Sequence, residues 1–182
     1  MQLSSLVRLE SSEKPLNLAD VGIGDYFDEF ISSHSVYAEE NNICIEYSHD
    51  CKDESFRIDK SEMNRVFGNL LENTVRHRND KSSVVKLSVT VGGGKAEIRY
   101  SDNGPGVRTE QLDRIFDSFY RGDESRTRPE NGSGLGLAVV KSIIVKHGGS
   151  VSAYIENGLG ILIVLPLAER KDINEKDTDN RG

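Results

Sequence analysis

The strongest hydrophobic pattern in the chain lies in the stretch Asp59–Arg78, which reads DKSEMNRVFGNLLENTVRHR. Apolar or small residues recur there at the 3.6-residue spacing of one helix face. These residues are Met63, Val66, Phe67, Leu70, Leu71, Thr74 and Val75. Asp59 is a typical N-cap residue, and Glu62 follows three positions later, as in a capping box. The pattern predicts one amphipathic helix that begins after Asp59.

A second, polar stripe runs along the same predicted helix through Asn69, Asn73, Arg76 and His77. Offsets of four, three and one place these side chains on one face. Asparagine favours caps and turns over helix interiors, so two asparagines four residues apart suggest a shared role. An amide oxygen is a ligand for hard cations. A simple solvent-facing stripe stays open as the alternative.

The pattern before this helix predicts a helix and two strands. Pro15 breaks a helical pattern over Met1–Glu13, and an extended link follows it. The expected elements are, in order, a helix from Asp20 or Gly24 to about Asn41, a strand over Ile43–Tyr47 and a short strand over Ser55–Ile58.

The pattern after this helix predicts two hairpins and two further helices. The expected elements are a hairpin of Val84–Val91 with Ala96–Tyr100, a short helix over Thr109–Phe116 with Thr109 as its cap, a polar loop over Phe116–Ser133, a helix over Leu135–His147 ended by Gly148, and a hairpin of Val151–Ile155 with Ile161–Leu165.

Neighbouring strands with helices between the pairs favour an α+β fold over a doubly wound parallel sheet. We expect a two-layer sandwich with a mostly antiparallel, mixed sheet and helices on one face. Residues 14–168 would form this domain. Residues 169–182 are almost wholly charged or polar, which predicts a disordered tail.

Composition narrows the class of protein. The 182 residues are 36% hydrophobic and 29% charged, as in soluble globular domains. The net charge of −7 argues against broad nucleic-acid binding. The chain has no apolar run of about 20 residues and no signal-peptide core at its start. Cys44 and Cys51 lack CxxC spacing, which suits reduced thiols in a cytoplasmic protein.

Two glycine clusters flank the polar loop. Asp102-Asn103-Gly104-Pro105-Gly106 follows a predicted strand and suits either a turn or a close backbone approach to a ligand. Gly132-Ser133-Gly134-Leu135-Gly136 opens a predicted helix, where backbone amides can bind an anion, although a flexible hinge is an alternative. Neither cluster fits a Walker A or a Rossmann motif.

Together these elements resemble the catalytic and ATP-binding domain of sensor histidine kinases, within the Bergerat-fold ATPases that include gyrase and the mismatch-repair ATPases. NLLENTVRH resembles the N box, DNGPGV the first glycine box, FDSFYR the F box and GSGLGLAVVK the second glycine box. The four motifs occur in the family's order. The resemblance covers about residues 15–167.

The resemblance implies roles for the polar stripe and the first glycine cluster. Asn73 resembles the magnesium ligand, and Asn69 and Arg76 would lie near the phosphates. His77 would lie against the nucleotide or face solvent. Asp102 resembles the residue that accepts a hydrogen bond from the exocyclic amine of adenine. Gly104 and Gly106 would make room for the base.

The resemblance also implies a lid over the nucleotide. Arg121 would face the γ-phosphate, and Arg126 and Arg128 are expected to be solvated charges. Phe116 and Phe119 would anchor the loop to the core. The lid would bring backbone amides to the phosphates as it closes. These amides would come from Gly132, Ser133, Gly134, Leu135 and Gly136.

One departure from hydrolytic relatives concerns the general base that activates water. Those relatives have a glutamate four residues before the metal asparagine, whereas this chain has Asn69, which cannot accept a proton. Glu72 lies about 100° off the stripe and should face outward. We therefore expect a kinase that holds Mg·ATP without fast hydrolysis, with Arg121 and Asn69 as catalytic residues. A second departure is Ile161, where the family commonly has serine or threonine.

The expected acceptor is a histidine on a separate dimerisation and phosphoacceptor domain. His34, His49 and His147 lack the family's acceptor pattern, and so does His77. Residues 1–13 resemble the end of that domain's second helix. A response regulator would be the next partner, in the cytoplasm, without nucleic acid or direct membrane contact by this part. Whether the full-length protein is membrane-anchored is open.

Three other functions stay open from the sequence alone. They are a hydrolytic Bergerat ATPase or clamp, a non-catalytic regulatory module, and a serine kinase of the anti-sigma type.

Overall fold

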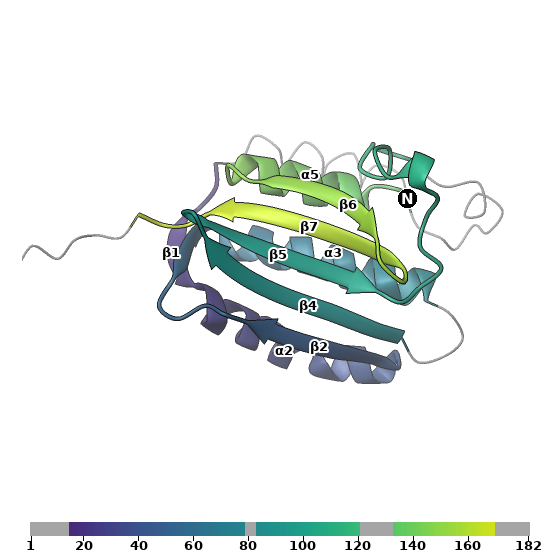
Figure 1. The fold of residues 1–182 in the computed structure, drawn as a ribbon, viewed down its shortest axis with the longest axis horizontal. Helices are drawn as coiled ribbons and strands as arrows, with labels where there is room; N and C mark the ends of the chain where they lie inside the picture. The colour runs from purple at the N-terminus through teal and green to yellow at the C-terminus, as the bar shows by residue number, and fades with distance from the viewer. Residues whose placement is uncertain (1–14, 79–82, 121–132, 170–182) are drawn as a thin grey trace, which may run out of the picture.

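A computed structural model describes residues 15–78, 83–120 and 133–169, and these residues form an α+β sandwich. Figure 1 shows one curved sheet with the helices on one of its faces, as the sequence predicts. The elements are β1 (Ala19–Gly22), α2 (Ile23–Glu40), β2 (Ile43–His49), β3 (Ser55–Ile58), α3 (Lys60–His77), β4 (Ser83–Gly92), β5 (Lys95–Asp102), the 3-10 turn η2 (Thr109–Gln111), α5 (Gly136–Lys146), β6 (Ser150–Ile155) and β7 (Leu159–Pro166).

The main sheet has the strand order β2-β4-β5-β7-β6. β2 and β4 are parallel, because β3 and α3 form the long crossover between them, and the other neighbours are antiparallel. The predicted mixed, mostly antiparallel sheet is therefore confirmed.

A small second sheet pairs β1 with β3, and β1 is absent from the sequence prediction. The segment Ala19–Gly22 is too short to show alternation, and its pairing partner lies far along the chain. Contacts between distant segments, such as Val21 with Phe56, determine this strand.

The core lies between the helices and the sheet, and α3 supplies much of it. Most of the predicted apolar stripe of α3 is buried, while Val75 is only partly covered. Phe67 packs edge-to-face on Phe27, with their ring centroids 5.0 Å apart. This packing fixes the helix that carries the polar stripe.

The N-terminus of α3 is capped by Asp59 as predicted. The other predicted bond of a capping box, from the Glu62 side chain back to the Asp59 backbone, does not form. The Asp59 carboxylate accepts hydrogen bonds from the backbone N–H groups of Ser61 and Glu62. The Glu62 side chain pairs with Arg65 at 2.8 Å instead of bonding back. The backbone N–H of Asp59 donates instead to His147 Nε2 at 3.0 Å, so a side chain distant in the sequence is the acceptor that Glu62 was predicted to be.

The predicted helix over Thr109–Phe116 is also wrong. Only the 3-10 turn Thr109–Gln111 forms, and non-helical turns follow it. Eight residues are too few for a stable helix without a packed apolar face. Here Ile115 and Phe116 point into the core from successive turns.

Several predictions fall on parts of the chain outside the described residues. They are the helical remnant at residues 1–13, loop residues 121–132, and the tail from residue 170 onward. Among the described helices, none has the length and apolar character needed to cross a membrane.

Candidate functional site

The polar stripe of α3 is only partly buried. Asn69 and Asn73 are half-buried, whereas Glu72 is exposed, as its position off the stripe predicts. The Asn69 amide group donates to the Arg65 carbonyl at 2.7 Å, which leaves Asn69 Oδ1 as an acceptor. The Asn73 side chain has no hydrogen-bond partner among the described residues, and Arg76 is exposed.

The second glycine cluster lies directly beside this stripe. A Cβ placed at Gly136 would lie 3.3 Å from Asn69 Oδ1. Leu135 is buried and occupies the N-cap position of α5, so the first amides of that helix lie close to Asn69. The start of α5 is thus a potential anion site next to two amide side chains.

Asp102, at the end of β5, is held by three hydrogen bonds. Its Oδ1 atom accepts from the backbone N–H of Gly104 at 2.9 Å and of Leu159 at 3.3 Å. Its Oδ2 atom accepts from Thr74 Oγ1 at 3.1 Å. Thr74 directly follows Asn73 on α3, so these bonds bring the first glycine cluster to the polar stripe.

The first glycine cluster packs between the end of α3 and the β6–β7 turn. A Cβ at Gly104 would lie 3.0 Å from Asp102 Oδ1 and 3.5 Å from the His77 carbonyl oxygen. Gly106 has φ +66°, and a Cβ there would lie 3.3 Å from the carbonyl carbon of Gly158. The side chain of His77 is half-buried. At Gly106 the positive φ and the close approach of the Gly158 backbone together favour glycine.

Two residues of this site were missed at the sequence level. Thr74 was assigned to the apolar stripe, although its hydroxyl beside Asn73 was an available signal. Gly158 lies directly against Asp102, because a Cβ there would collide with the Asp102 carbonyl oxygen and would lie 2.8 Å from Asp102 Oδ1. The Asn157-Gly158 pair in the predicted hairpin turn gave only a turn signal.

The two ends of the polar loop meet at its base. The Phe119 N–H donates to the Gly134 carbonyl at 3.0 Å, and Gly134 has φ +71°. Phe116 is buried and anchors the segment as predicted. The same prediction for Phe119 is wrong, because its backbone turns at φ +65° and leaves the ring 60% exposed.

The remaining predicted residues are only partly described. Ser133 is exposed, and Gly134 is half-buried. Arg121, Arg126, Arg128 and Gly132 lie outside the described residues. Among the described residues, no group of three or more His, Cys, Asp or Glu side chains could hold a metal ion.

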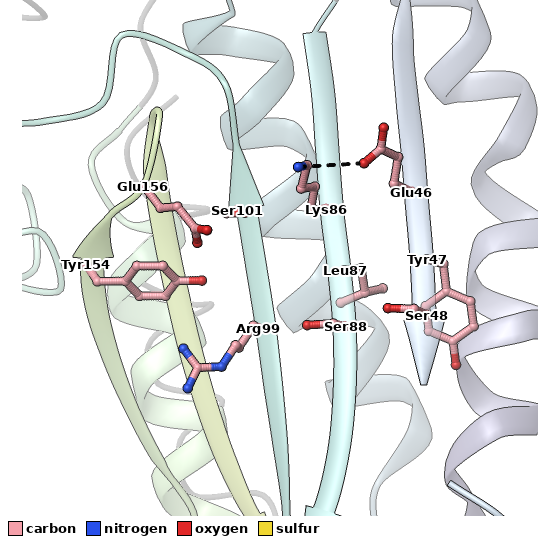
Figure 2. Close-up of a pocket in the computed structure, with 10 residues that line it drawn as sticks. All are labelled: Glu46, Tyr47, Ser48, Lys86, Leu87, Ser88, Arg99, Ser101, Tyr154 and Glu156. Carbon is pink, nitrogen blue, oxygen red and sulfur yellow. Dashed lines mark ion pairs between the residues drawn. The ribbon is translucent and has the colours of Figure 1, made fainter. Parts of the chain in front are cut away.

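A separate hollow lies on the open face of the sheet, opposite the helices (Figure 2). Its volume is about 400 Å³, and its lining includes Lys86, paired with Glu46 at 3.9 Å. The Tyr154 hydroxyl points toward Arg99 and Ser101, and burial, aided by the charge of Glu156, raises the pKa of Tyr154. Charges of both signs line this hollow, and it contains none of the predicted site residues.

The arrangement on the helical side combines three chemistries. The oxygens of Asn69 and Asn73 can bind a cation, the first amides of α5 can bind an anion, and Asp102 can accept from an amine. Residues from distant parts of the chain supply them, and the fold brings them together.

The sequence matches that of known proteins over most of its length. The profile described as "Histidine kinase-, DNA gyrase B-, and HSP90-like ATPase" matches residues 58–169. The sensor-like histidine kinase SenX3 of Mycobacterium tuberculosis is 33% identical over 168 residues, which is 91% of this chain and 40% of SenX3. The sensor protein kinase WalK of Staphylococcus saprophyticus is 30% identical over 173 residues, which is 93% of this chain and 28% of WalK.

Solved structures share the fold. The nucleotide-free catalytic domain of the histidine kinase ThkA superposes with a TM-score of 0.71 at 20% identity, over 83% of this chain and 96% of that one. Full-length ShkA in complex with AMPPNP superposes with a TM-score of 0.74 at 25% identity, over 91% of this chain and 34% of that one. The chain thus spans less than half the length of the curated relatives it matches.

Proposed function

Because the chain belongs to the family of histidine kinase-, DNA gyrase B- and HSP90-like ATPases, we propose that it binds Mg·ATP and transfers the γ-phosphoryl group to a histidine on a separate domain. The observation that carries this proposal is that the Asn69–Asn73 stripe of α3 lies next to both Asp102 and the start of α5. Asp102 bonds to the residue next to Asn73, and Gly136 lies against Asn69.

In this proposal, Asp102 reads the base. A carboxylate accepts from the exocyclic amine of adenine, whereas guanine in the same pose would present a carbonyl oxygen. Gly104 and Gly106 let the backbone after Asp102 pack closely on Asp102 and Gly158, and the family resemblance implies that the base lies beside this backbone. His77 lies at the same end of α3.

The phosphates would lie toward Asn69, Arg76 and the start of α5. The amides of Ser133, Gly134, Leu135 and Gly136 would donate to phosphate oxygens, and the family resemblance implies that Gly132 and Arg121 would complete the lid. Phosphoryl transfer depends mainly on such positioning and charge neutralisation.

Asn73 fits the role of the magnesium ligand. Its neutral oxygen has no partner among the described residues, and ATP itself would supply the negative charge around the ion. When bound, Mg²⁺ would neutralise charge on the phosphates.

The site supports transfer more than hydrolysis. Asn69 occupies the position from which a glutamate would activate water, and an amide cannot take the proton. Glu72 is exposed and lies next to Asn73 in the sequence, about 100° around the helix from it. We infer that the acceptor histidine lies in another part of the full-length protein and that a cytoplasmic response regulator receives the phosphoryl group next. The histidine kinase ThkA, which shares this fold, has been solved in complex with the response regulator protein TrrA, and this supports the partner class.

Calorimetry and phosphotransfer assays test the proposal. The chain should bind ATP and ADP in the presence of Mg²⁺, and should phosphorylate a supplied phosphoacceptor domain of its own full-length protein. Asn73→Asp and Asp102→Asn should abolish nucleotide binding or transfer. Glu72→Gln, on the exposed face of the same helix, is the matched control and should behave as wild type.

Three outcomes would overturn the proposal. Normal binding and transfer by Asn73→Asp and Asp102→Asn would show that the site lies elsewhere. Steady hydrolysis near 1 s⁻¹, on the order of an ordinary enzyme rate, would instead favour a hydrolytic ATPase. A chain that binds no ATP would be a non-catalytic module.

A further inference from the structure

We propose that Thr74, held in place by Tyr100, orients the Asp102 carboxylate and so determines the preference for adenine over guanine. The inference rests on the proposed function, because it concerns how Asp102 reads a base. Thr74 and Tyr100 are positioning residues in this scheme, and of these three side chains only Asp102 would contact the nucleotide.

The three side chains form one hydrogen-bonded chain between the sheet and α3, buried at Tyr100 and Thr74 and half-buried at Asp102. Tyr100 Oη lies 2.9 Å from Thr74 Oγ1, and Thr74 Oγ1 lies 3.1 Å from Asp102 Oδ2. Thr74 is 2% exposed and Tyr100 is 4% exposed. Water therefore has little access to compete for these hydrogen bonds, and a low dielectric strengthens each of them.

The direction of the hydrogen bonds follows from the chemistry of the groups. A carboxylate oxygen can only accept, so Thr74 must give its single hydroxyl proton to Asp102. Tyr100 must then donate its own proton to Thr74 Oγ1. Burial raises the pKa of the Tyr100 hydroxyl, which keeps this proton in place at neutral pH.

A count of acceptor positions shows what is left for a ligand. A carboxylate offers about four acceptor positions, two on each oxygen. Among the described residues, Gly104 and Leu159 fill both positions on Oδ1, and Thr74 fills one on Oδ2. One position on Oδ2 remains, and it can accept only from a donor such as the adenine amine.

Thr74 thus fixes which oxygen faces the base. Without its hydroxyl, Oδ2 loses its protein partner and the carboxylate can rotate about χ2, which is a soft torsion. A rotated carboxylate, or a water molecule beside it, would accept from the donor groups of guanine as well. Loss of this bond should therefore reduce selectivity as well as affinity.

The test compares ATP and GTP affinities of the whole chain by calorimetry with Mg²⁺. Thr74→Val keeps the shape and removes the hydroxyl, and it should weaken ATP binding by about tenfold with a smaller effect on GTP. Thr74→Ser retains the hydroxyl and should restore the wild-type ratio. Tyr100→Phe should give an intermediate ratio, because Thr74 can still donate to Asp102.

Thr74→Val leaves the Tyr100 hydroxyl buried without its partner, which could unfold the protein. The double variant Thr74→Val/Tyr100→Phe removes both polar groups and avoids that penalty. Thermal unfolding of each variant establishes that it is folded before affinities are compared.

The possible results separate this inference from the proposed function. A folded Thr74→Val or double variant with the wild-type ratio of ATP to GTP affinity overturns the inference alone. A wild-type chain that binds neither nucleotide overturns the proposed function and this inference with it. A lowered ratio that Thr74→Ser restores supports both.

Discussion

Asp59 shows how one side chain fixes the helix on which the site depends. Its Oδ1 atom accepts from the Ser61 hydroxyl at 2.7 Å and from two backbone N–H groups at the start of α3, and its Oδ2 atom accepts from the Asn17 N–H at 3.0 Å. Burial raises the pKa of Asp59, but these hydrogen bonds outweigh it, so the pKa is lowered overall. The ionised form therefore stabilises the fold.

The stability that Asp59 provides should depend on pH. A carboxyl group with a lowered folded pKa contributes at pH values above its unfolded pKa of about 4, and this contribution is lost as the pH falls through the folded value. Asp59→Ala should lower the free energy of unfolding by about 0.5–2 kcal/mol at pH 7. Urea unfolding at pH 7 and at pH 3 and below should show the difference between the two proteins shrinking.

Asp59→Asn is the control, since asparagine is also a good N-cap but does not titrate. It should lose less stability than Asp59→Ala at pH 7. A difference between wild type and Asp59→Ala that stays constant down to the lowest pH would contradict the assigned role of the charge.

Residue identity predicted part of the site, and its limit is clear at Thr74. The sequence singles out Asn69 and Asn73 because amides in mid-helix are unusual, whereas the role predicted for Asp102 comes from the family resemblance, since an acid before glycines also fits a simple turn. Thr74 was not identified, because a threonine in an apolar stripe counts as a small core residue. Its partner Asp102 lies 28 positions away, and only the folded chain brings the two together.

At the scale of elements, both ends of α5 contact α3. The start of α5 lies against Asn69 of α3, and its C-cap, His147, reaches the start of α3. His147 is 7% exposed; its Nε2 atom accepts from the Asp59 N–H, and Nδ1 bonds to the Ile143 carbonyl at 2.8 Å. These bonds require a neutral ring with its proton on Nδ1. This contact fixes the position of α5 along α3, and therefore the position of the start of α5 relative to Asn69.

Replacement of His147 tests the tie between the helices. His147→Leu keeps the volume but leaves the Asp59 N–H without its acceptor, so the free energy of unfolding should fall by about 1–3 kcal/mol. His147→Gln can still accept this bond and should recover part of the loss. Denaturant unfolding measures both effects, and equal stability of His147→Leu and wild type would rule out a structural role for the bond.

Elements with a clear local pattern were predicted from the sequence, and those without one were not. The period of α3 and the glycine turn between β4 and β5 are local signals, and both elements form as expected. β1 was missed because its pairing with β3 is non-local. Thr109–Phe116 was overpredicted because its apolar residues anchor to the core through turns instead of a helix face.

At the scale of the molecule, the order of strands in the sheet determines where Asp102 lies. β5 lies at the centre of the sheet, so Asp102 at its end faces α3 on one side and the β6–β7 turn on the other. The aromatic core of α2 packs on the same helix, α3. A ligand that bridges Asn73, Asp102 and α5 would therefore stabilise the whole sandwich.

Mg·ATP should consequently raise the stability of the entire domain in one transition. At a free concentration of 100 times its dissociation constant, a ligand that binds only the folded state adds about 2.7 kcal/mol to the free energy of unfolding. For a domain of this size, that corresponds to several degrees in melting temperature, at about 2–4 °C per kcal/mol. Circular dichroism and calorimetry should report the same midpoint, since small domains unfold cooperatively.

The controls for this prediction separate specific binding from the general effects of a polyanion. Mg·GTP at the same concentration should give a smaller shift, and Asp102→Asn should lose most of the shift with Mg·ATP. ATP with a chelator should also stabilise less, because Asn73 would have no cation to hold. The protein carries a net charge of −7, so its overall electrostatic field does not attract ATP that has lost its Mg²⁺. Two separate transitions, or equal shifts with ATP and GTP, would show that the bridged elements do not form one nucleotide-binding unit.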